Sequence, residues 1–175
     1  MKTLASQIVY KNNWMTVRED IVERENGTTG IYGIVEKPDF AVIAAIEDGK
    51  VYLVEQLRYP VGSAFWELPQ GSWESDSPHP DELAKAELRE ETGIIAHEME
   101  HIGHLFLAYG YSNQGYDIFL ASSLEHGSQA LDTEEHGLTA RCFSIADVEA
   151  MILHGSIKDA TTVAAFGLLK LKQKI

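Results

Sequence analysis

The sequence contains a single cysteine, few basic residues and no long apolar run. Cys142 cannot form an internal disulfide, so the fold does not depend on an oxidising compartment, and we expect a buried structural thiol. Lysine and arginine number 14 against 27 aspartates and glutamates, which gives a formal net charge of −13. Such a surface repels nucleic acids and anionic membranes unless a cation intervenes. Because no run approaches the roughly 18 apolar residues of a membrane span, we expect a cytoplasmic protein with neither kind of partner.

Hydrophobic residues make up 45% of the 175 residues, enough for one compact globular domain. Short apolar or alternating segments at residues 8–10, 14–18, 41–46, 51–54, 102–107 and 116–120 predict strands. Residues 80–92 predict a helix that opens with prolines and ends at Gly93, and residues 144–155 and 161–171 predict two more. Strands first, a helix in the middle and helices last favour an α/β or α+β fold around one mixed sheet.

Three glutamates of the central predicted helix carry the clearest chemical signal. Glu87, Glu90 and Glu91 stand at positions i, i+3 and i+4, so their carboxylates share one helix face and repel each other. The negative end of the helix dipole adds to this repulsion, and a bound cation would reverse both effects. Hard divalent ions such as Mg²⁺ prefer oxygen ligands of this kind. The helix taken alone favours a solvated acidic face, partly neutralised by Lys85 and Arg89, over a metal site.

The segment around these glutamates resembles the signature motif of a known family. Residues 87–94, Glu-Leu-Arg-Glu-Glu-Thr-Gly-Ile, match the second half of the Nudix box, and Gly71 matches its opening glycine. Residues 53–60, 67–71 and 155–162 also resemble the ADP-ribose and nucleoside-diphosphate-sugar pyrophosphatase branch of the Nudix hydrolases. The resemblance implies an α/β/α sandwich around a mixed β-sheet with an N-terminal antiparallel strand region. It further implies one Nudix hydrolase domain over residues 1–175, with dimer-forming strands at about 1–37 and the core at about 38–175.

The match to the box is incomplete at two positions. Ala86 occupies the place of the box arginine, and the early glutamate is missing from Ser77-Pro78, in a loop that is one residue longer than the pattern. In the family these two residues brace the loop against the helix, and the prolines of this loop could stiffen it instead. The departures keep a non-catalytic nucleotide-sensing module open as an alternative.

By resemblance, the chain hydrolyses the diphosphate bond of ADP-ribose or a nucleoside diphosphate sugar and releases a nucleoside monophosphate and a sugar phosphate. The implied cofactor is Mg²⁺, with Mn²⁺ as a substitute. The implied metal ligands are Glu87, Glu91, Glu90 and the backbone carbonyl of Gln70. The alternative within the same family is a hydrolase of nucleoside triphosphates or dinucleoside polyphosphates.

The remaining implied site residues lie outside the box. Glu135, or its neighbour Glu134, is the candidate catalytic base, with Glu90 as a further candidate; a polar loop without a role is the alternative for the first two. Trp14 is a candidate for stacking on the nucleobase, or else a core or dimer-interface aromatic. Arg58 is a candidate for binding phosphate or ribose, or else pairs with one of the many acids. The branch commonly forms homodimers that exchange N-terminal segments, so we expect a homodimer.

Several other residues are expected to be structural. His97, His101 and His104 have helical spacing for a zinc site, but the surrounding sequence favours a strand, in which His101 and His104 point to opposite sides. Trp66 and Trp73 flank the start of the box, where each either lines the site or packs the loop, and we expect both to be structural.

Overall fold

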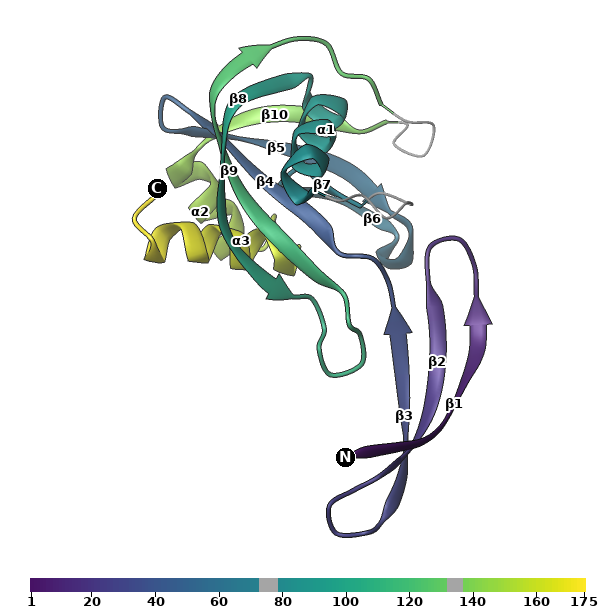
Figure 1. Cartoon of the computed structure of the whole chain (residues 1–175). Helices are drawn as coiled ribbons and strands as arrows, with labels where there is room; N and C mark the ends of the chain where they lie inside the picture. The colour runs from purple at the N-terminus through teal and green to yellow at the C-terminus, as the bar shows by residue number, and fades with distance from the viewer. Residues whose placement is uncertain (73–78, 132–136) are drawn as a thin grey trace.

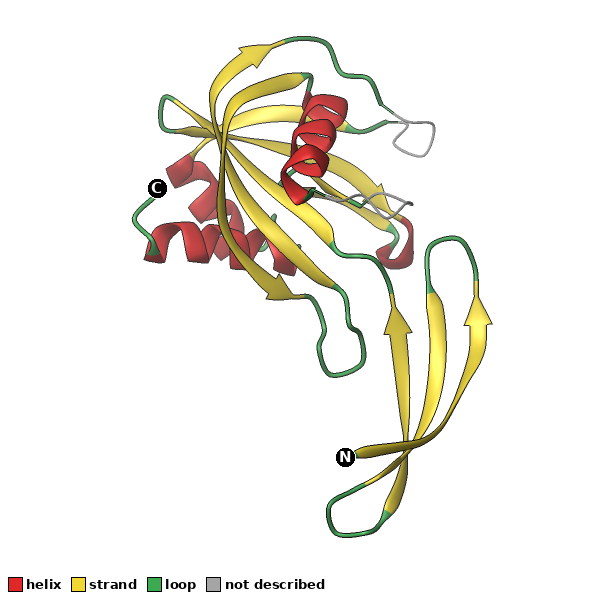
Figure 2. Ribbon diagram, viewed as in Figure 1, coloured by secondary structure: helices red, strands yellow, loops and turns green. Residues whose placement is uncertain are grey.

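A computed structural model describes residues 1–72, 79–131 and 137–175 of the chain. They form a three-stranded sheet followed by a larger unit in which helices cover both faces of a second sheet (Figures 1 and 2). The elements in chain order are β1 (Lys2–Lys11), β2 (Thr16–Glu23), β3 (Thr29–Glu36), β4 (Phe40–Glu47), β5 (Lys50–Arg58), the 3₁₀ turn η1 (Tyr59–Val61), β6 (Ser63–Glu67), β7 (Gln70–Gly71), α1 (Pro80–Thr92), β8 (Ile94–Phe106), β9 (Gly115–His126), β10 (Thr139–Ser144), α2 (Ile145–Leu153) and α3 (Ala160–Leu171).

The larger sheet is mixed, as predicted. Its strands run in the order β10-β5-β4-β9-β8, with β6 added beside β5 and β7 beside β4. Strands β4 and β9 are parallel, whereas the other named pairs of this sheet run antiparallel. The short strand β7 pairs with the start of β4, so the glycine of the box lies beside a central strand.

Strand β4 separates two apolar cores. Its buried residues Ala41 and Ile43 face α1, where Leu88 packs on them. The alternate residues Val42 and Ala44 face α2 and α3. All five residues from 41 to 45 are fully buried, which explains why this strand is a continuous apolar run rather than an alternating one. The expected sandwich of helices around a mixed sheet is confirmed.

Helix α1 has the predicted bounds. Pro80 stands in its first turn and Gly93 ends it with a left-handed φ of 76°. A side chain at Gly93 would also meet the backbone carbonyl oxygen of Gly127 at 2.7 Å, so both conformation and space require glycine there. Within the described residues, no helix is long and apolar enough to span a membrane.

The N-terminal sheet projects from the rest of the chain (Figure 1). All ten residues of β1 are exposed, and β3 contacts the core through Val35, whose N–H donates to the Tyr111 carbonyl at 2.8 Å. Trp14, expected in a strand, lies instead in the turn between β1 and β2. The Asn12 side-chain oxygen accepts hydrogen bonds there from the N–H groups of Trp14 and Met15, at 2.9 and 2.8 Å. This side-chain cap replaces strand pairing and forms the turn.

The expectation of a buried Cys142 is wrong. Cys142 lies on β10, which is an edge strand of the larger sheet, and its thiol is exposed. Its sequence neighbours, Arg141 and Phe143, did not reveal that β10 pairs with a strand on one side alone. Across the strand pair, Cys142 faces Tyr52, and burial together with this thiol raises the pKa of Tyr52 to about 12.

Candidate active site

The three glutamates of the box lie on one face of α1. The helix is continuous from Pro80 to Thr92, so the predicted spacing of Glu87, Glu90 and Glu91 becomes a spatial cluster. Glu91 is 1% exposed, and the other two are half-buried. A carboxylate buried to this extent is costly unless it is hydrogen-bonded or bound to a cation, so this face differs from an ordinary solvated acidic surface.

Strand β7 meets this cluster directly. The backbone N–H of Gln70 donates to Oε2 of Glu91 at 3.0 Å. The carboxylate of Glu87 lies over Gly71 so closely that a Cβ atom there would overlap it. The glycine of the motif therefore makes room for the glutamate of the motif, and the structure brings Gln70, Glu87 and Glu91 together.

These groups fit a hard divalent cation. In the described parts of the chain, no group of three His, Cys, Asp or Glu side chains is arranged to hold a metal ion by itself. Mg²⁺ does not require such a cage, because it binds through one or two carboxylates and completes its coordination with water and substrate phosphates. The carboxylates of Glu87 and Glu91 beside a backbone strand supply oxygen ligands of the right kind.

Arg58 is held by a buried carboxylate. Glu67, 2% exposed, accepts hydrogen bonds from Gln56 Nε2 at 2.8 Å, from Arg58 Nε at 3.3 Å and from Arg58 Nη2. Burial raises the pKa of Glu67, and the Arg58 guanidinium opposes that rise. The side chain of Arg58 is 42% exposed, so one edge of the guanidinium is fixed while the residue still reaches solvent. Arg58 therefore pairs with an acid, Glu67, which was one of its two expected roles. The edge of the guanidinium that does not contact Glu67 is compatible with the other role, phosphate binding.

The first turn of α3 also reaches this region, which the sequence did not predict. Asp159 caps α3, since its Oδ2 accepts the N–H of Thr162 at 2.8 Å. The same oxygen accepts a hydrogen bond from Gln70 Nε2 at 3.3 Å. An aspartate directly before Ala-Thr-Thr is a recognisable helix-start signal, but its contact with Gln70, 89 residues earlier, is tertiary.

The other predicted site residues lie apart or outside the described residues. Trp14 is half-exposed in the β1–β2 turn, which Figure 1 shows separate from α1. Glu134 and Glu135 fall within residues 132–136, outside the part that the structure describes, and so does Trp73, in residues 73–78. Trp66 packs edge-on against Phe143, with ring centroids 4.9 Å apart.

The expected orientation of two histidines is wrong. A register shift between His101 and Gly103 places one extra residue in β8. This bulge turns His101 and His104 to the same side, where both contact Oδ1 of Asp117, at 2.7 and 3.4 Å. A strand without a bulge would have separated them, and nothing in the local sequence marks the irregularity.

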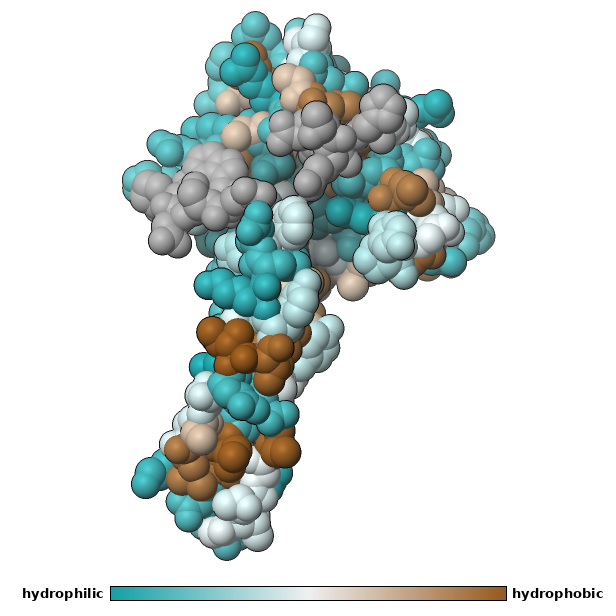
Figure 3. All heavy atoms as spheres, turned by 90° about the vertical axis from the view of Figure 1, so that its right-hand side faces the viewer, coloured by the Kyte–Doolittle hydropathy of each residue, from teal (hydrophilic) through white to brown (hydrophobic). Residues whose placement is uncertain are grey.

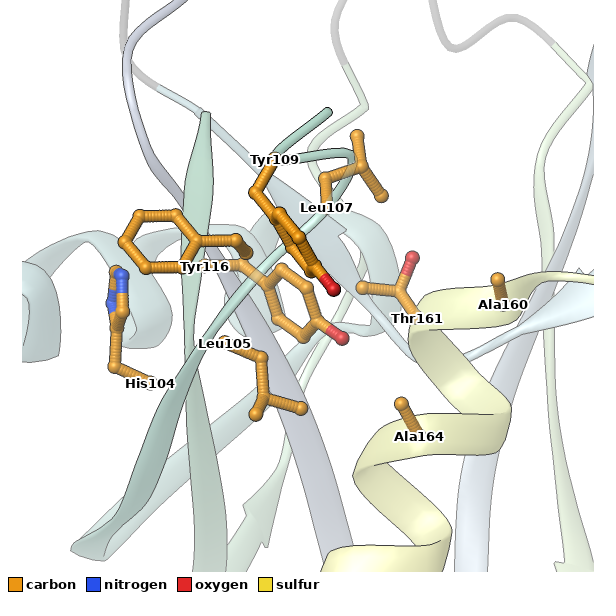
Figure 4. Close-up of a pocket in the computed structure, with 9 residues that line it drawn as sticks. His104, Leu105, Leu107, Tyr109, Tyr116, Ala160, Thr161 and Ala164 are labelled. Atoms are coloured by element: carbon orange, nitrogen blue, oxygen red, sulfur yellow. The ribbon is translucent and has the colours of Figure 1, made fainter. Parts of the chain in front are cut away.

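A pocket of about 430 Å³ opens beside α3 (Figure 4). The hydroxyl groups of Tyr109 and Tyr116 point toward the first turn of this helix, near Thr161. Burial raises the pKa of Tyr116, and the Asp159 carboxylate adds to the rise. Tyr116 belongs to the core on the α2–α3 side of the sheet, so this pocket does not contain the α1 glutamates.

Comparisons with known proteins agree with this geometry. The NUDIX domain matches residues 37–166, and the nucleoside diphosphate sugar hydrolase N-terminal domain matches residues 1–35. The ADP-ribose pyrophosphatase of Mycobacterium tuberculosis (strain ATCC 25618 / H37Rv) is 29% identical over 93% of this chain and 80% of its own length. The ADP-ribose pyrophosphatase of Bacillus subtilis (strain 168) is 28% identical over 99% of this chain and 95% of its own length.

A solved structure described as an ADP compounds hydrolase superposes with a TM-score of 0.87. The superposition covers 99% of this chain and 95% of the other chain, at 21% sequence identity. It establishes that the two chains share a fold. The family match extends over well more than half of the chain and includes the segment where β7 meets α1. The chain therefore belongs to the Nudix family of pyrophosphatase hydrolases.

Proposed function

We propose that this protein is a metal-dependent hydrolase of ADP-ribose or a nucleoside diphosphate sugar. One observation carries the proposal: Glu91 is buried and accepts the Gln70 N–H, while the Glu87 carboxylate lies over Gly71. This arrangement gathers oxygen ligands at the negative end of the helix dipole. The carboxylates there repel one another unless a cation is bound between them. The names of the two ADP-ribose pyrophosphatases among its relatives support the substrate class.

Glu87, Glu91, Glu90 and the backbone carbonyl of Gln70 would hold Mg²⁺ or Mn²⁺. Such an ion neutralises phosphate charge and lowers the pKa of a bound water. It also allows an acidic protein to bind an anionic substrate, because it inverts the local potential. Arg58, fixed on one edge by Glu67, presents its outer N–H groups to a phosphate oxygen.

Catalysis needs a group that takes a proton from the attacking water. Glu135 or Glu134 fills this role, with Glu90 as the candidate on α1 itself. The water oxygen bonds to one phosphorus, the bond from that phosphorus to the bridging oxygen breaks, and the bridging oxygen leaves with the other phosphate. The products are a nucleoside monophosphate and a sugar phosphate, and the proton goes to the carboxylate.

A panel of substrates tests the proposal. ADP-ribose, several nucleotide sugars, nucleoside triphosphates and dinucleoside polyphosphates are incubated with Mg²⁺, and the products are identified by mass. We expect a nucleoside monophosphate from the first two classes and loss of turnover in Glu91→Gln. Glu82→Gln is the matched control, since Glu82 is an exposed glutamate of the same helix. Turnover confined to triphosphates or dinucleoside polyphosphates, undiminished turnover in excess chelator, or nucleotide binding without turnover each contradicts the proposal.

We also propose that residues 1–175 form one hydrolase domain whose N-terminal strands join two copies. The N-terminal sheet exposes large apolar side chains on its strands, and Figure 3 shows hydrophobic atoms gathered along this projecting part of the molecule. Ile8 is 62% exposed and Ile31 is 66% exposed, and a patch of exposed apolar side chains supports an interaction surface. A second copy would cover this face and bring its Trp14 toward the neighbouring core.

The oligomeric state tests the dimer separately from the chemistry. Light scattering after size exclusion should give the mass of two chains, and Ile31→Lys should give the mass of one. Leu153→Lys is the matched control, because Leu153 is also an exposed apolar residue, at 83% against 66% for Ile31, but lies at the end of α2, outside the N-terminal sheet. A wild-type monomer, or a dimer unaffected by Ile31→Lys, contradicts this assignment.

A further inference from the structure

The strand that carries Gln70 is held from the side of α1 and β4. The N–H of Gln70 donates to Glu91 Oε2 at 3.0 Å. One residue earlier, the carbonyl of Pro69 accepts the N–H of Ile43 at 2.9 Å. These two bonds fix the backbone of residues 69–70 against the central strand and against a proposed metal ligand.

The same segment is held from the side of α3 by a second set of bonds. The N–H of Leu68 donates to Oγ1 of the fully buried Thr162 at 2.9 Å, and this hydroxyl donates to Oδ2 of Asp159 at 2.7 Å. Gln70 Nε2 donates to the same carboxylate oxygen at 3.3 Å. Both bonds from residues 68–70 therefore lead to Asp159, one directly and one through Thr162.

Capping alone does not require this arrangement. A helix N-cap needs one side-chain oxygen that accepts an N–H of the first turn. Ser144 does this for α2, where its Oγ accepts the Asp147 N–H at 3.1 Å. Asp159 satisfies the same requirement with Thr162 and in addition binds Gln70 from another part of the chain.

We propose that Asp159 is a positioning residue for the metal site. It holds the side chain of Gln70, and thereby the backbone of β7, at the place where Glu87 and Glu91 meet that strand. The inference rests on the proposed metal-dependent function, and it assigns to the cap of α3 a role in cation affinity. Groups that orient metal ligands typically contribute about 10–100-fold to affinity. Because Asp159 acts through Gln70, we expect the lower end of this range.

Mn²⁺ binding to the purified full-length chain, followed by the electron paramagnetic resonance signal of the free ion, tests the proposal without turnover. Asp159→Ser keeps a capping oxygen but is too short to reach Gln70, and Gln70→Ala removes the contact while leaving the cap intact. Each variant should weaken Mn²⁺ binding by about 10-fold. The double variant should bind no more weakly than Asp159→Ser alone, because Gln70→Ala removes a contact that Asp159→Ser has already lost.

Ser144→Ala is the matched control, since it removes the cap of α2 and should lower the Tm without changing Mn²⁺ affinity. Wild-type Mn²⁺ affinity in Asp159→Ser and Gln70→Ala, or losses of Mn²⁺ affinity that add in the double variant, would overturn this inference but not the proposed function. If the wild-type chain shows no saturable Mn²⁺ binding that Glu91→Gln removes, the proposed function fails and this inference with it.

Discussion

The contact between Gly71 and Glu87 gives the sharpest test of the proposed metal site. Gly71→Ala places a methyl group where the Glu87 carboxylate lies. Ordinary contact begins near 3.4 Å, so the carboxylate must retreat by about 1 Å. The overlapping atoms are the far end of a flexible side chain, so the carboxylate can move and the Tm should change little.

The functional cost should be much larger than the structural one. Metal ligands tolerate displacements of about 0.2 Å, so a shift of about 1 Å removes Glu87 from coordination. Misplacement on this scale costs about 10²-fold in rate. We therefore expect Gly71→Ala to raise the Mg²⁺ concentration for half-maximal activity at least about 10-fold and to lower kcat by about 10²-fold.

Steady-state kinetics across a Mg²⁺ titration, with the Tm measured on the same samples, provides the assay. Gly167→Ala is the control, because Gly167 lies exposed in α3 with no atom within 4 Å of the added Cβ. This control should keep wild-type kinetics and gain slightly in stability. A Gly71→Ala protein with wild-type Mg²⁺ dependence and kcat refutes the assignment of Glu87 to the metal.

Three further predictions address other parts of the proposed site. Glu135→Gln, or failing that Glu134→Gln, should lower kcat by at least about 10²-fold while metal-dependent thermal stabilisation persists; wild-type turnover in both and in the double variant places the base elsewhere. Trp14→Ala should raise KM more than it lowers kcat, provided that it stays folded and keeps its oligomeric state, and an unchanged KM returns the indole to a structural role. Burial raises the pKa of the Glu67 carboxyl group in the folded chain. The stabilisation that Glu67 contributes is therefore greatest at a pH below the pKa that this group has in the unfolded chain, and it is lost as the pH rises through the pKa that the group has in the folded chain. The Tm of the wild type relative to Glu67→Gln should therefore increase as the pH falls from about 7 to about 4, and a constant or decreasing difference contradicts this.

Local signals in the sequence predicted the elements that local chemistry controls. The start and end of α1 follow from Pro80 and Gly93, and the meeting of β7 with the glutamates follows from the motif that contains Gly71. The start of α2 was predicted from its capping side chain, Ser144, whereas α3 was predicted from its amphipathic pattern and its cap, Asp159, was not. Resemblance to the family then supplied the arrangement of layers.

Tertiary pairing controlled what the sequence did not predict. Glu67 and Arg58 meet because β5 and β6 are antiparallel neighbours, and β6 was not expected as a strand. Asp159 reaches Gln70 because α3 packs beneath β4, a relation that no pattern within α3 expresses. The bulge that joins His101 and His104 depends on how β8 registers with β9, which is decided by packing on both faces of the sheet.

The parallel pairing of β4 with β9 has a consequence for the order of folding. Phe40 is paired with Tyr116, so the central strand cannot complete its sheet until the chain has been synthesised well past α1. Contacts between residues so distant in sequence form slowly, whereas the antiparallel β1–β2–β3 sheet is local and can form early. The nascent chain therefore exposes the apolar side chains of its N-terminal sheet before the larger sheet has formed its core. Apolar surface that is exposed at this stage is prone to association with other chains before the α1 glutamates reach β7.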